Sequence, residues 1–474
     1  MSTAVVVGGG PNGLAAAIEL GRVGRSVRLY EAADEVGGGA RSAELTLPGF
    51  VHDPCSSVHP LSLGSPFLRS LDLGRHGLAW VQPDAPVAHA LAPGRSIVLP
   101  RALGDPALDE ELGADASRWR GLLGPLAREW DRLAPAVLGP IVRPPRHPLL
   151  LARFGLPGLL PASALGRLAF RGEPARALFA GFAAHSMLRL TQPGSAGYGL
   201  VTGLLAHAVG WPLARGGSGS IARALEAEAR SHGVEIVTGH RVASLRELPP
   251  ARAVVLDLTP RQVLEVAGDR LPARYRRQLE RFRYGPGVFK IDWALSGPIP
   301  WLDGATARAG TVHLGGSLRD LVASEAAPSK GRIHDRPFIL LVQPTLFDPS
   351  RAPEGKHIAW AYIHVPAGSI EDLTERIEAR VDQFAPGFRD LILARATRDA
   401  AAMEAYDANY VGGDINGGIG DLRQLLFRPV VRWDPYTTPD PSLFLGSSST
   451  PPGGGVHGMS GYHAARAAER RLRA

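Results

Sequence analysis

The chain opens with an apolar run that gives way to glycine. Residues Ala4–Val7 predict a buried strand, residues 14–22 have the composition of a helix, and Val27–Tyr30 predict a second strand. Four of the six residues at positions 8–13 are glycine. The pattern predicts a strand, a tight glycine turn, a helix and a strand, which together form one βαβ unit.

The rest of the chain divides into a helical stretch and further strands. Residues 60–213 are rich in Leu, Ala, Pro and Arg, with helix-like stretches at 114–133 and 176–188, so we expect a mostly helical insertion. Strands are expected at 234–237, Ala253–Leu256, 288–295, 338–342 and 357–363, and the last three are expected to share a second sheet. The chain closes with a strand at 442–445, a glycine loop at 453–455 and a helix at 460–472.

This order of elements predicts an α/β fold in which a Rossmann-type dinucleotide-binding domain is built from discontinuous segments. That domain is expected at 1–59, 205–284 and 405–474. A substrate-binding domain of mixed sheet and helical insertion is expected at 60–204 and 285–404.

Composition narrows the class of protein. A chain of 474 residues is long enough for two or three domains and for a core that encloses a ligand. The net charge is +7, but the basic residues are dispersed arginines and include only three lysines, which argues against a nucleic-acid partner. The single cysteine, Cys55, excludes an internal disulfide and a multi-cysteine metal site and favours a reducing, cytoplasmic location. We expect no metal site, signal peptide or membrane-spanning segment.

The glycine turn carries the most specific chemical signal. Its spacing is Gly8-x-Gly10-x-x-Gly13, and Glu31 ends the next strand. Such glycines permit a tight turn, a close approach of backbone N–H groups to a pyrophosphate, and close packing of helix and strand, while the acid binds ribose hydroxyls. The competing interpretation is a simple glycine turn. The residues expected to bind the dinucleotide here are Gly8, Gly10, Pro11, Asn12, Gly13 and Glu31.

A second glycine turn favours FAD over NAD as the expected cofactor. Gly37, Gly38 and Gly39 precede Arg41, soon after Glu31. A dinucleotide that continues past its pyrophosphate, as FAD does, gains from a second anchor of this kind. We therefore expect Gly38, Gly39 and Arg41 to contact non-covalently bound FAD.

The chain has a family resemblance. It rests on these motifs, on residues 210–212, on the pair Gly216-Gly217 and on the terminal segment 451–462. It resembles the phytoene desaturase-like branch of FAD-dependent oxidoreductases, which includes the amine oxidase fold, and within it the pyridine nucleotide-disulfide oxidoreductase domain-containing proteins. The resemblance covers nearly the whole chain and is least specific at 60–205. A disulfide mechanism cannot hold here, because one cysteine cannot form a redox disulfide.

The resemblance assigns roles to further residues. It implies flavin contacts at Gly454, Val456, His457, Gly458 and Met459. Many flavoproteins of this branch have Gly-Asp before the loop, whereas this chain has Gly446-Ser447, so Ser447 takes the place of the usual acid. The helix that follows can aim its positive end at a reduced flavin. The alternative is an ordinary glycine-rich terminal turn.

Two residues, Val242 and Lys290, have both a functional and a purely structural interpretation. Val242 matches the position whose backbone holds the adenine in this branch, and is otherwise a core valine. Lys290 resembles the lysine that amine oxidase relatives place near the flavin, and we expect it to be catalytic. Alternation along 288–295 puts it on the same face as Val288 and Asp292, and the other interpretation is a solvent-facing lysine paired with Asp292.

Histidines and an apolar segment complete the set of candidates. Of His52, His59, His185, His207 and His457, only His457 is expected to be catalytic; the others are expected to be structural. Residues 147–161 combine prolines with leucines, which indicates either a peripheral membrane contact or ordinary helix packing.

The sequence as a whole predicts an FAD-dependent oxidoreductase that removes a hydride from a C–H bond of a largely apolar organic substrate, as in a dehydrogenase or desaturase. O2 or a quinone is the expected acceptor, because only one dinucleotide fingerprint is present. The alternatives are an amine (C–N) oxidase that uses Lys290, a redox-neutral isomerase or saturase, and a non-catalytic flavin-binding scaffold. A small-molecule substrate and a homodimer are the expected partners.

Overall fold

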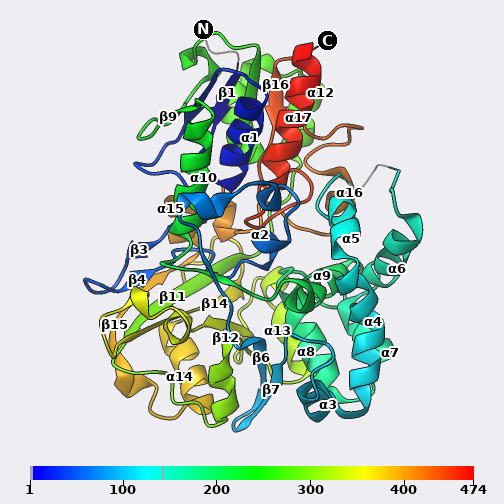
Figure 1. Ribbon diagram of the computed structural model, residues 1–474, viewed down its shortest axis with the longest axis vertical. Coiled ribbons are helices and arrows are strands. Elements are labelled where there is room, and N and C mark those ends of the chain that lie inside the picture. Colours follow the sequence, from blue (N-terminus) through cyan, green and yellow to red (C-terminus); the bar gives the residue numbers. More distant parts are fainter. Residues whose placement is uncertain (1–3, 141–143, 474) are drawn as a thin grey trace.

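The computed structural model describes residues 4–140 and 144–473. The predicted domain segments 1–59 and 405–474 therefore have their outermost residues, 1–3 and 474, outside the described part. Figure 1 shows a parallel sheet that carries both chain ends at the top, a mixed sheet below it, and a helical region at the right.

The upper sheet has five parallel strands. In spatial order they are β16 (Leu443–Leu445), β10 (Ala253–Leu256), β1 (Ala4–Val7), β2 (Val27–Tyr30) and β9 (Glu235–Val237). One face packs on α1 (Pro11–Arg22), α10 (Gly219–Ser231) and α17 (Met459–Arg473), and the other on α11 (Pro260–Ala267) and α12 (Ala273–Glu280). Successive residues of β1 supply both cores, because side chains alternate along a strand.

The lower sheet has seven strands and mixed polarity, because β6 pairs with β12 in parallel and the other pairs are antiparallel. In spatial order they are β15 (Ile392–Arg398), β11 (Gly287–Leu295), β14 (His357–Val365), β13 (Ile339–Val342), β12 (Ala309–Leu314), β6 (Ala85–Ala92) and β7 (Arg95–Leu99). One face packs on α14 (Thr374–Phe384) through apolar residues such as Ile291 and Val381. The opposite face is the floor of the cavity described below.

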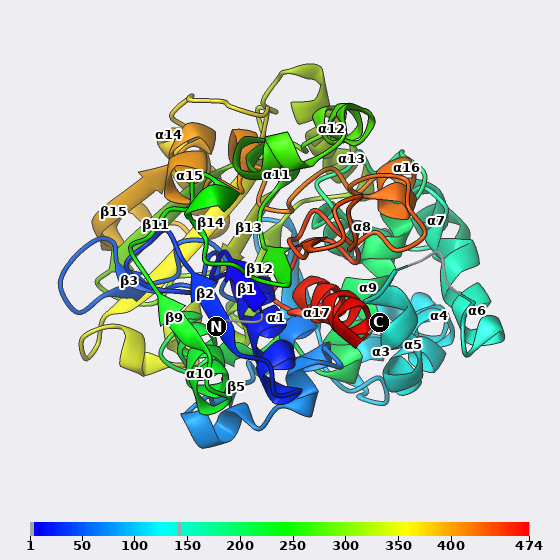
Figure 2. The same ribbon diagram turned by 90° about the horizontal axis from the view of Figure 1, so that it is seen from above.

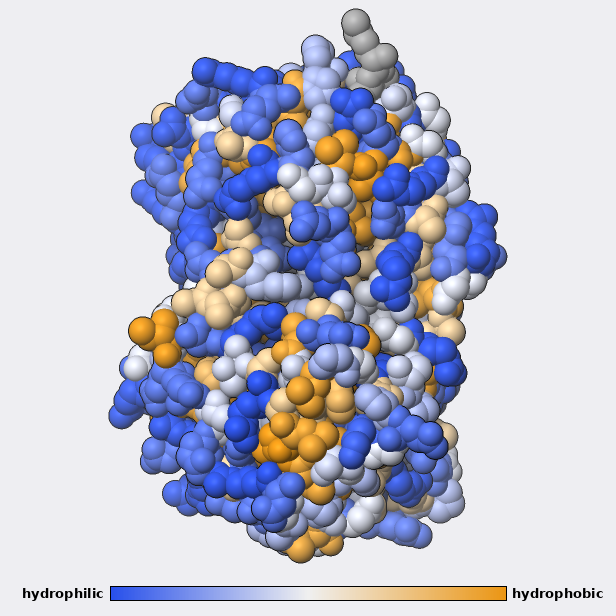
Figure 3. Space-filling model, turned by 90° about the vertical axis from the view of Figure 1, so that its left-hand side faces the viewer, coloured by the Kyte–Doolittle hydropathy of each residue, from blue (hydrophilic) through white to orange (hydrophobic). Residues whose placement is uncertain are grey.

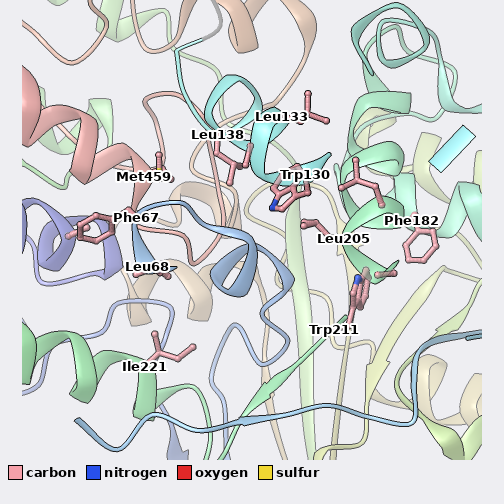
Figure 4. Packing of buried hydrophobic residues seen from close by; sticks show 14 of the residues in the cluster. Phe67, Leu68, Trp130, Leu133, Leu138, Phe182, Leu205, Trp211, Ile221 and Met459 are labelled. Atoms are coloured by element: carbon pink, nitrogen blue, oxygen red, sulfur yellow. The ribbon is translucent and has the colours of Figure 1, made fainter. Parts of the chain in front are cut away.

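The helical region closes the space beside the two sheets (Figures 1 and 2). Its helices are α2 (Pro60–Gly64), α3 (Ala107–Leu112), α4 (Ala116–Arg128), α5 (Trp130–Val137), α6 (Pro148–Gly158), α7 (Ala162–Ala169), α8 (Glu173–Ala184) and α9 (Ser195–Ala208). The remaining helices are α13 (Leu318–Ala326), α15 (Ala400–Tyr406) and α16 (Leu422–Phe427). A continuous core joins this region to the parallel sheet, from Phe182 and Trp211 through Trp130 to Phe67 and Met459 (Figure 4).

The α/β fold class with a Rossmann-type parallel sheet and a mixed sheet is confirmed. The domain boundaries stay a prediction. The three expected strands around 288, 338 and 357 do share one sheet. The helix expected at 114–133 is two helices that meet at Glu129. Strands β6 and β7 lie inside the region expected to be mostly helical. The four alanines of β6 obscure that strand, because alanine has little strand preference.

One expected orientation is wrong. The strand 288–295 was expected to be half-buried, with a solvent-facing side for Lys290 as one interpretation, yet every residue of β11 is buried. The sheet has α14 on one face and the helical region and the parallel sheet beyond the other, so neither face of this central strand reaches solvent.

Candidate functional site

A cavity of about 1180 Å³ lies between the two sheets and the helical region. Its upper wall contains the glycine turn at Gly10 and the C-terminal loop at Gly454. Its floor is the mixed sheet, represented by Trp360, and its side wall is the helical region, represented by Phe154 and Val201. Segments far apart in sequence therefore meet around one space.

The glycine turn is as tight as its spacing predicts. Gly8 has φ +100°, and a Cβ atom built on Gly13 would lie 1.9 Å from the Gly8 carbonyl oxygen. The turn leads directly into α1, whose first residue is Pro11. Only glycine allows this approach, and the positive end of α1 points toward the cavity wall formed by Gly10, Pro11 and Asn12.

Glu31 and Arg41 are held next to the turn. Glu31 Oε2 accepts a hydrogen bond from the Gly9 amide at 2.7 Å, and its Oε1 accepts one from the Ala33 amide at 2.8 Å. Arg41 Nη2 lies 3.3 Å from Glu31 Oε1, and the guanidinium sits 5.7 Å from the ring centroid of Tyr406. The buried Arg41 Nε atom has no hydrogen-bond partner in the described part of the chain, so one donor remains available for a ligand.

Asp257 is a site residue that sequence reasoning missed. It follows β10, and its Oδ2 accepts a hydrogen bond from the Gly13 amide at 2.8 Å. A Cβ atom on Gly10 would lie 2.9 Å from the same oxygen. Burial raises the pKa of Asp257 to about 8, although the Gly13 hydrogen bond opposes this, and Asp407 and Glu31 raise it further. The only available signal was its place after a buried parallel strand, where such sheets bind ligands.

His457 stabilises the C-terminal loop through two hydrogen bonds. The Met459 amide donates to His457 Nδ1 at 3.0 Å, and His457 Nε2 lies 3.2 Å from the Gly453 carbonyl oxygen. Burial lowers the pKa of His457 to about 4, so the ring is neutral and Nε2 carries its proton. Both ring nitrogens are thus occupied within the loop. The catalytic role expected for His457 stays a prediction.

Lys290 forms a buried ion pair. Its ammonium contacts Asp292, and Nζ lies 5.0 Å from the ring centroid of Trp360. Burial lowers the pKa of Lys290, against the opposing effect of Asp292. Lys290 is not itself among the cavity-lining residues; Trp360 and Tyr362, its neighbours on β14, are. Its catalytic role also stays a prediction.

The other histidines have protein partners. His52 Nδ1 lies 3.5 Å from Asp292, and His59 Nε2 lies 2.8 Å from Ser218 Oγ. His207 accepts from Trp119 Nε1 at 2.9 Å and donates to the Arg101 carbonyl oxygen at 2.8 Å. His59 and His185 line the cavity.

The structure brings most of the predicted cofactor contacts to one cavity. The predicted residues that line it are Gly10, Pro11, Asn12, Gly38, Gly39, Ser447, Gly454, Val456, His457 and Met459. Those outside its lining are Gly8, Gly13, Glu31, Arg41, Val242, Gly458 and Lys290. Gly8 and Gly13 belong to the glycine turn, and Glu31 and Arg41 lie next to it. Val242 packs instead in the hydrophobic core on the α11 and α12 side of the parallel sheet.

The side wall of the cavity continues to an exposed apolar surface. Leu150 and Phe154 of α6 line the cavity, while Leu149 and Leu156 of the same helix are 86% and 70% exposed. Among the described residues no single helix is both long and apolar enough to cross a bilayer; α6 and α7 reach that length only as a pair bent by 104°. The opposite flank of the molecule, seen in Figure 3, carries hydrophobic patches among hydrophilic residues.

Comparisons with known proteins agree with this architecture. Residues 6–69 match the NAD(P)-binding Rossmann-like domain family. Pyridine nucleotide-disulfide oxidoreductase domain-containing protein 2 of Rattus norvegicus is 27% identical over 552 aligned residues, covering 99% of this chain and 94% of the rat protein. An oxidoreductase structure from Methanosarcina mazei has a TM-score of 0.66 at 16% identity, covering 98% of this chain and 99% of that one. A putrescine oxidase structure bound to putrescine has a TM-score of 0.63 at 16% identity, covering 100% and 99%.

The two structural neighbours establish the fold, and the rat protein is a relative over almost the full length. The rat protein, the Methanosarcina mazei protein and putrescine oxidase are all named as oxidoreductases or oxidases. The chain therefore carries a Rossmann-type nucleotide-binding domain, is similar throughout its length to the pyridine nucleotide-disulfide oxidoreductase domain-containing proteins, and shares its fold with putrescine oxidase.

Proposed function

We propose that this chain binds FAD non-covalently and removes a hydride from a C–H bond of a largely apolar organic substrate, as a dehydrogenase or desaturase, with O2 or a quinone as acceptor. The observation that carries the proposal is one continuous cavity, which reaches from the glycine turn and the C-terminal loop to an apolar helical wall. Such a cavity has room for a dinucleotide at one side and a substrate at the other.

The residues present fit FAD. Asn12 Oδ1 and Arg41 Nε are buried polar atoms without a partner beside the glycine turn. Glu31 would accept hydrogen bonds from ribose hydroxyls, and the α1 N-terminus would bind a pyrophosphate. At neutral pH the protonated Asp257 carboxyl places no negative charge against those phosphates. When bound, FAD supplies the isoalloxazine ring that accepts a hydride.

The chain's own residues orient the substrate and keep water away. Leu151, Phe154 and Val201 present apolar side chains from the helical region, opposite Leu340 and Tyr362 on the mixed sheet. These surfaces favour an apolar substrate body and exclude water from the reacting C–H bond. An amine (C–N) oxidase remains the second candidate, because putrescine oxidase shares this fold. Redox-neutral isomerisation or saturation, or a non-catalytic scaffold, would use the same residues.

Two measurements test the proposal. Gently purified protein should carry a bound-flavin spectrum, or acquire one when FAD is added; a protein that remains colourless in both cases does not have the proposed function. Anaerobic mixing with apolar candidate substrates should then bleach the oxidised flavin. A protein that acts only after its flavin has been reduced is instead an isomerase or saturase.

We further propose that α6 contacts a membrane surface and passes apolar substrate to the cavity. The exposed Leu149 and Leu156 lie on the same short helix as the cavity-lining Leu150 and Phe154. Exposed arginines, Arg146 and the neighbouring Arg153, provide charge that suits an anionic headgroup. A homodimer stays a prediction.

A further inference from the structure

Buried histidines extend from the cavity into the mixed sheet. His185 follows α8, is half-buried and lines the cavity. Behind it His313 of β12 is fully buried, and its Nε2 lies 3.0 Å from His185 Nε2. His89 of β6 is the register partner of His313 on the neighbouring strand. Among the described residues no group of three His, Cys, Asp or Glu side chains could hold a metal ion, so the row requires another explanation.

The Nδ1 atoms of His89 and His313 both face the backbone of α8 at Gly181. His89 Nε2 lies 2.8 Å from the Gly316 carbonyl oxygen, so it carries that ring's proton. Nδ1 of His89 and Nδ1 of His313 are both buried, and neither has a hydrogen-bond partner within residues 4–140 and 144–473. A Cβ atom on Gly181 would lie 2.8 Å and 2.7 Å from these two atoms, so both of them pack against the backbone of α8.

Both members of the His185–His313 pair are neutral. Burial lowers the pKa of His185 to about 3 and lowers the pKa of His313 well below its ordinary value. One of the two Nε2 atoms therefore carries a proton and donates it in a hydrogen bond to the other. If it belonged to His185, His313 would carry its own proton on Nδ1, as a buried donor with no acceptor. An orphaned N–H is rarer in proteins than an unused lone pair, so the proton belongs to His313.

The tautomer of His185 follows from that of His313. When His313 donates through Nε2–H, His185 Nε2 accepts, and the one proton of the neutral His185 ring must be on Nδ1. Nε2 is already bound, so Nδ1 is the ring nitrogen left for a ligand in the cavity. Trp211, in edge-on contact with His185 at 5.2 Å between ring centroids, fixes the ring plane (Figure 4 labels Trp211 and the adjacent Phe182).

We propose that His185 offers Nδ1–H to the cavity as a fixed, uncharged donor, and that the substrate carries an uncharged acceptor oxygen, such as a carbonyl, at that point. His313 is the positioning residue that sets the tautomer. The inference rests on the proposed function, since it takes the cavity as the substrate site. It also separates the two candidate substrates, because an ammonium group has only donors to offer to this N–H.

Histidine tautomers test the geometry directly on the whole protein. In 15N–1H spectra of histidine-labelled protein, assigned with single His→Gln variants, we expect His185 protonated at Nδ1 and His313 at Nε2. His207 and His89 serve as internal references, because their partners fix Nδ1–H and Nε2–H respectively. A His185 ring protonated at Nε2 or on both nitrogens would overturn the inference. This readout does not depend on flavin or turnover.

Ligand selection tests the consequence. The preference for octan-2-one over 2-methyloct-1-ene, which replaces C=O by C=CH2, is measured as the ratio of the two affinities, and His185 should raise this ratio roughly tenfold, as expected for one neutral hydrogen bond. H185F should remove this gain. H313L should weaken it, and H313Q, which keeps a donor near the Nε2 position, should restore it. An equal preference in wild type and H185F contradicts the inference even if the protein binds FAD and is reduced by substrate. Conversely, absence of FAD binding contradicts only the proposed function.

Discussion

At the scale of single residues, Lys290 is the point where function and stability meet. Its ammonium and the Asp292 carboxylate are both buried and in contact, so each compensates most of the cost of burying the other. We expect K290M to lower the free energy of unfolding by about 3 kcal/mol, because it leaves the buried Asp292 carboxylate without its ammonium partner and with only His52 beside it. Denaturant unfolding of K290M, of K290M/D292L, which removes both charges, and of K330M, an exposed lysine, measures this.

The same substitution tests the catalytic role predicted for Lys290. If Lys290 acts on the reaction, K290M slows flavin reduction or reoxidation while FAD stays bound, and K330M does not. Unchanged rates in both half-reactions would leave Lys290 with a structural role alone. The stability measurement stands in either case, because it depends on the ion pair and not on the cavity.

We expect Asp257 to make the affinity for FAD depend on pH. Its pKa of about 8 means that the carboxyl is mostly neutral at pH 6 and mostly charged at pH 9, beside Glu31 and Asp407. A negative charge at the glycine turn opposes a pyrophosphate, so FAD affinity should fall as pH rises through 8, on the order of tenfold by pH 9. FAD titrations at pH 6, 7.5 and 9 test this. D257N should flatten the profile, and an equally steep profile in D257N would assign the effect to another group.

At the scale of elements, the glycine turn depends on backbone contact. A methyl group on Gly13 would lie 1.9 Å from the Gly8 carbonyl oxygen, so G13A must separate β1 from α1. We expect G13A to lose FAD binding and to unfold at a lower denaturant concentration. G121A is the matched control: Gly121 is an exposed glycine inside α4 with no atom near its Cβ position, and alanine there should be neutral or stabilising by up to about 1 kcal/mol. Retention of FAD by G13A would contradict the role assigned to the turn.

Helix α6 is the second element with a separable role. L149S/L156S removes two exposed leucines without touching the cavity lining. If α6 enters a bilayer surface, binding to vesicles of phosphatidylcholine and phosphatidylglycerol should weaken roughly tenfold in co-sedimentation, because two apolar side chains are no longer buried. I370S changes a residue 74% exposed in the segment before α14, and should bind as wild type does. Equal binding by all three proteins would refute the membrane contact.

At the scale of the whole molecule, FAD should act as a structural component. The cavity is walled by pieces from both ends of the chain and from the helical region, so a ligand that spans it stabilises only the folded state. At a free FAD concentration 100 times its dissociation constant, the gain is about 2.7 kcal/mol. Thermal unfolding with increasing FAD should show a rising midpoint. FMN, which lacks the adenosine that Glu31 is expected to hold, should raise it less, and an equal effect of both would argue against the assigned orientation.

Local sequence patterns were sufficient to predict part of the fold and of the candidate site. The glycine turn and the strand and helix that flank it were predictable, because the close backbone approach between Gly8 and Gly13 requires glycine and leaves a local spacing in the sequence. Most residues predicted to contact the cofactor line one cavity. The burial of β11 was not predictable, since alternation along a strand distinguishes its two faces but does not say what covers each of them.

Only the tertiary structure decided the chemistry inside the cavity. Asp257 meets the glycine turn across 244 positions of the chain, and His185 meets His313 across 128. Such distant pairs leave no local pattern, because neither residue changes the secondary structure around it. Their protonation depends on burial, and burial is a property of the assembled fold. The amino-acid sequence alone predicted the glycine turn, and the tertiary structure decided which buried polar groups lie beside it and around the cavity.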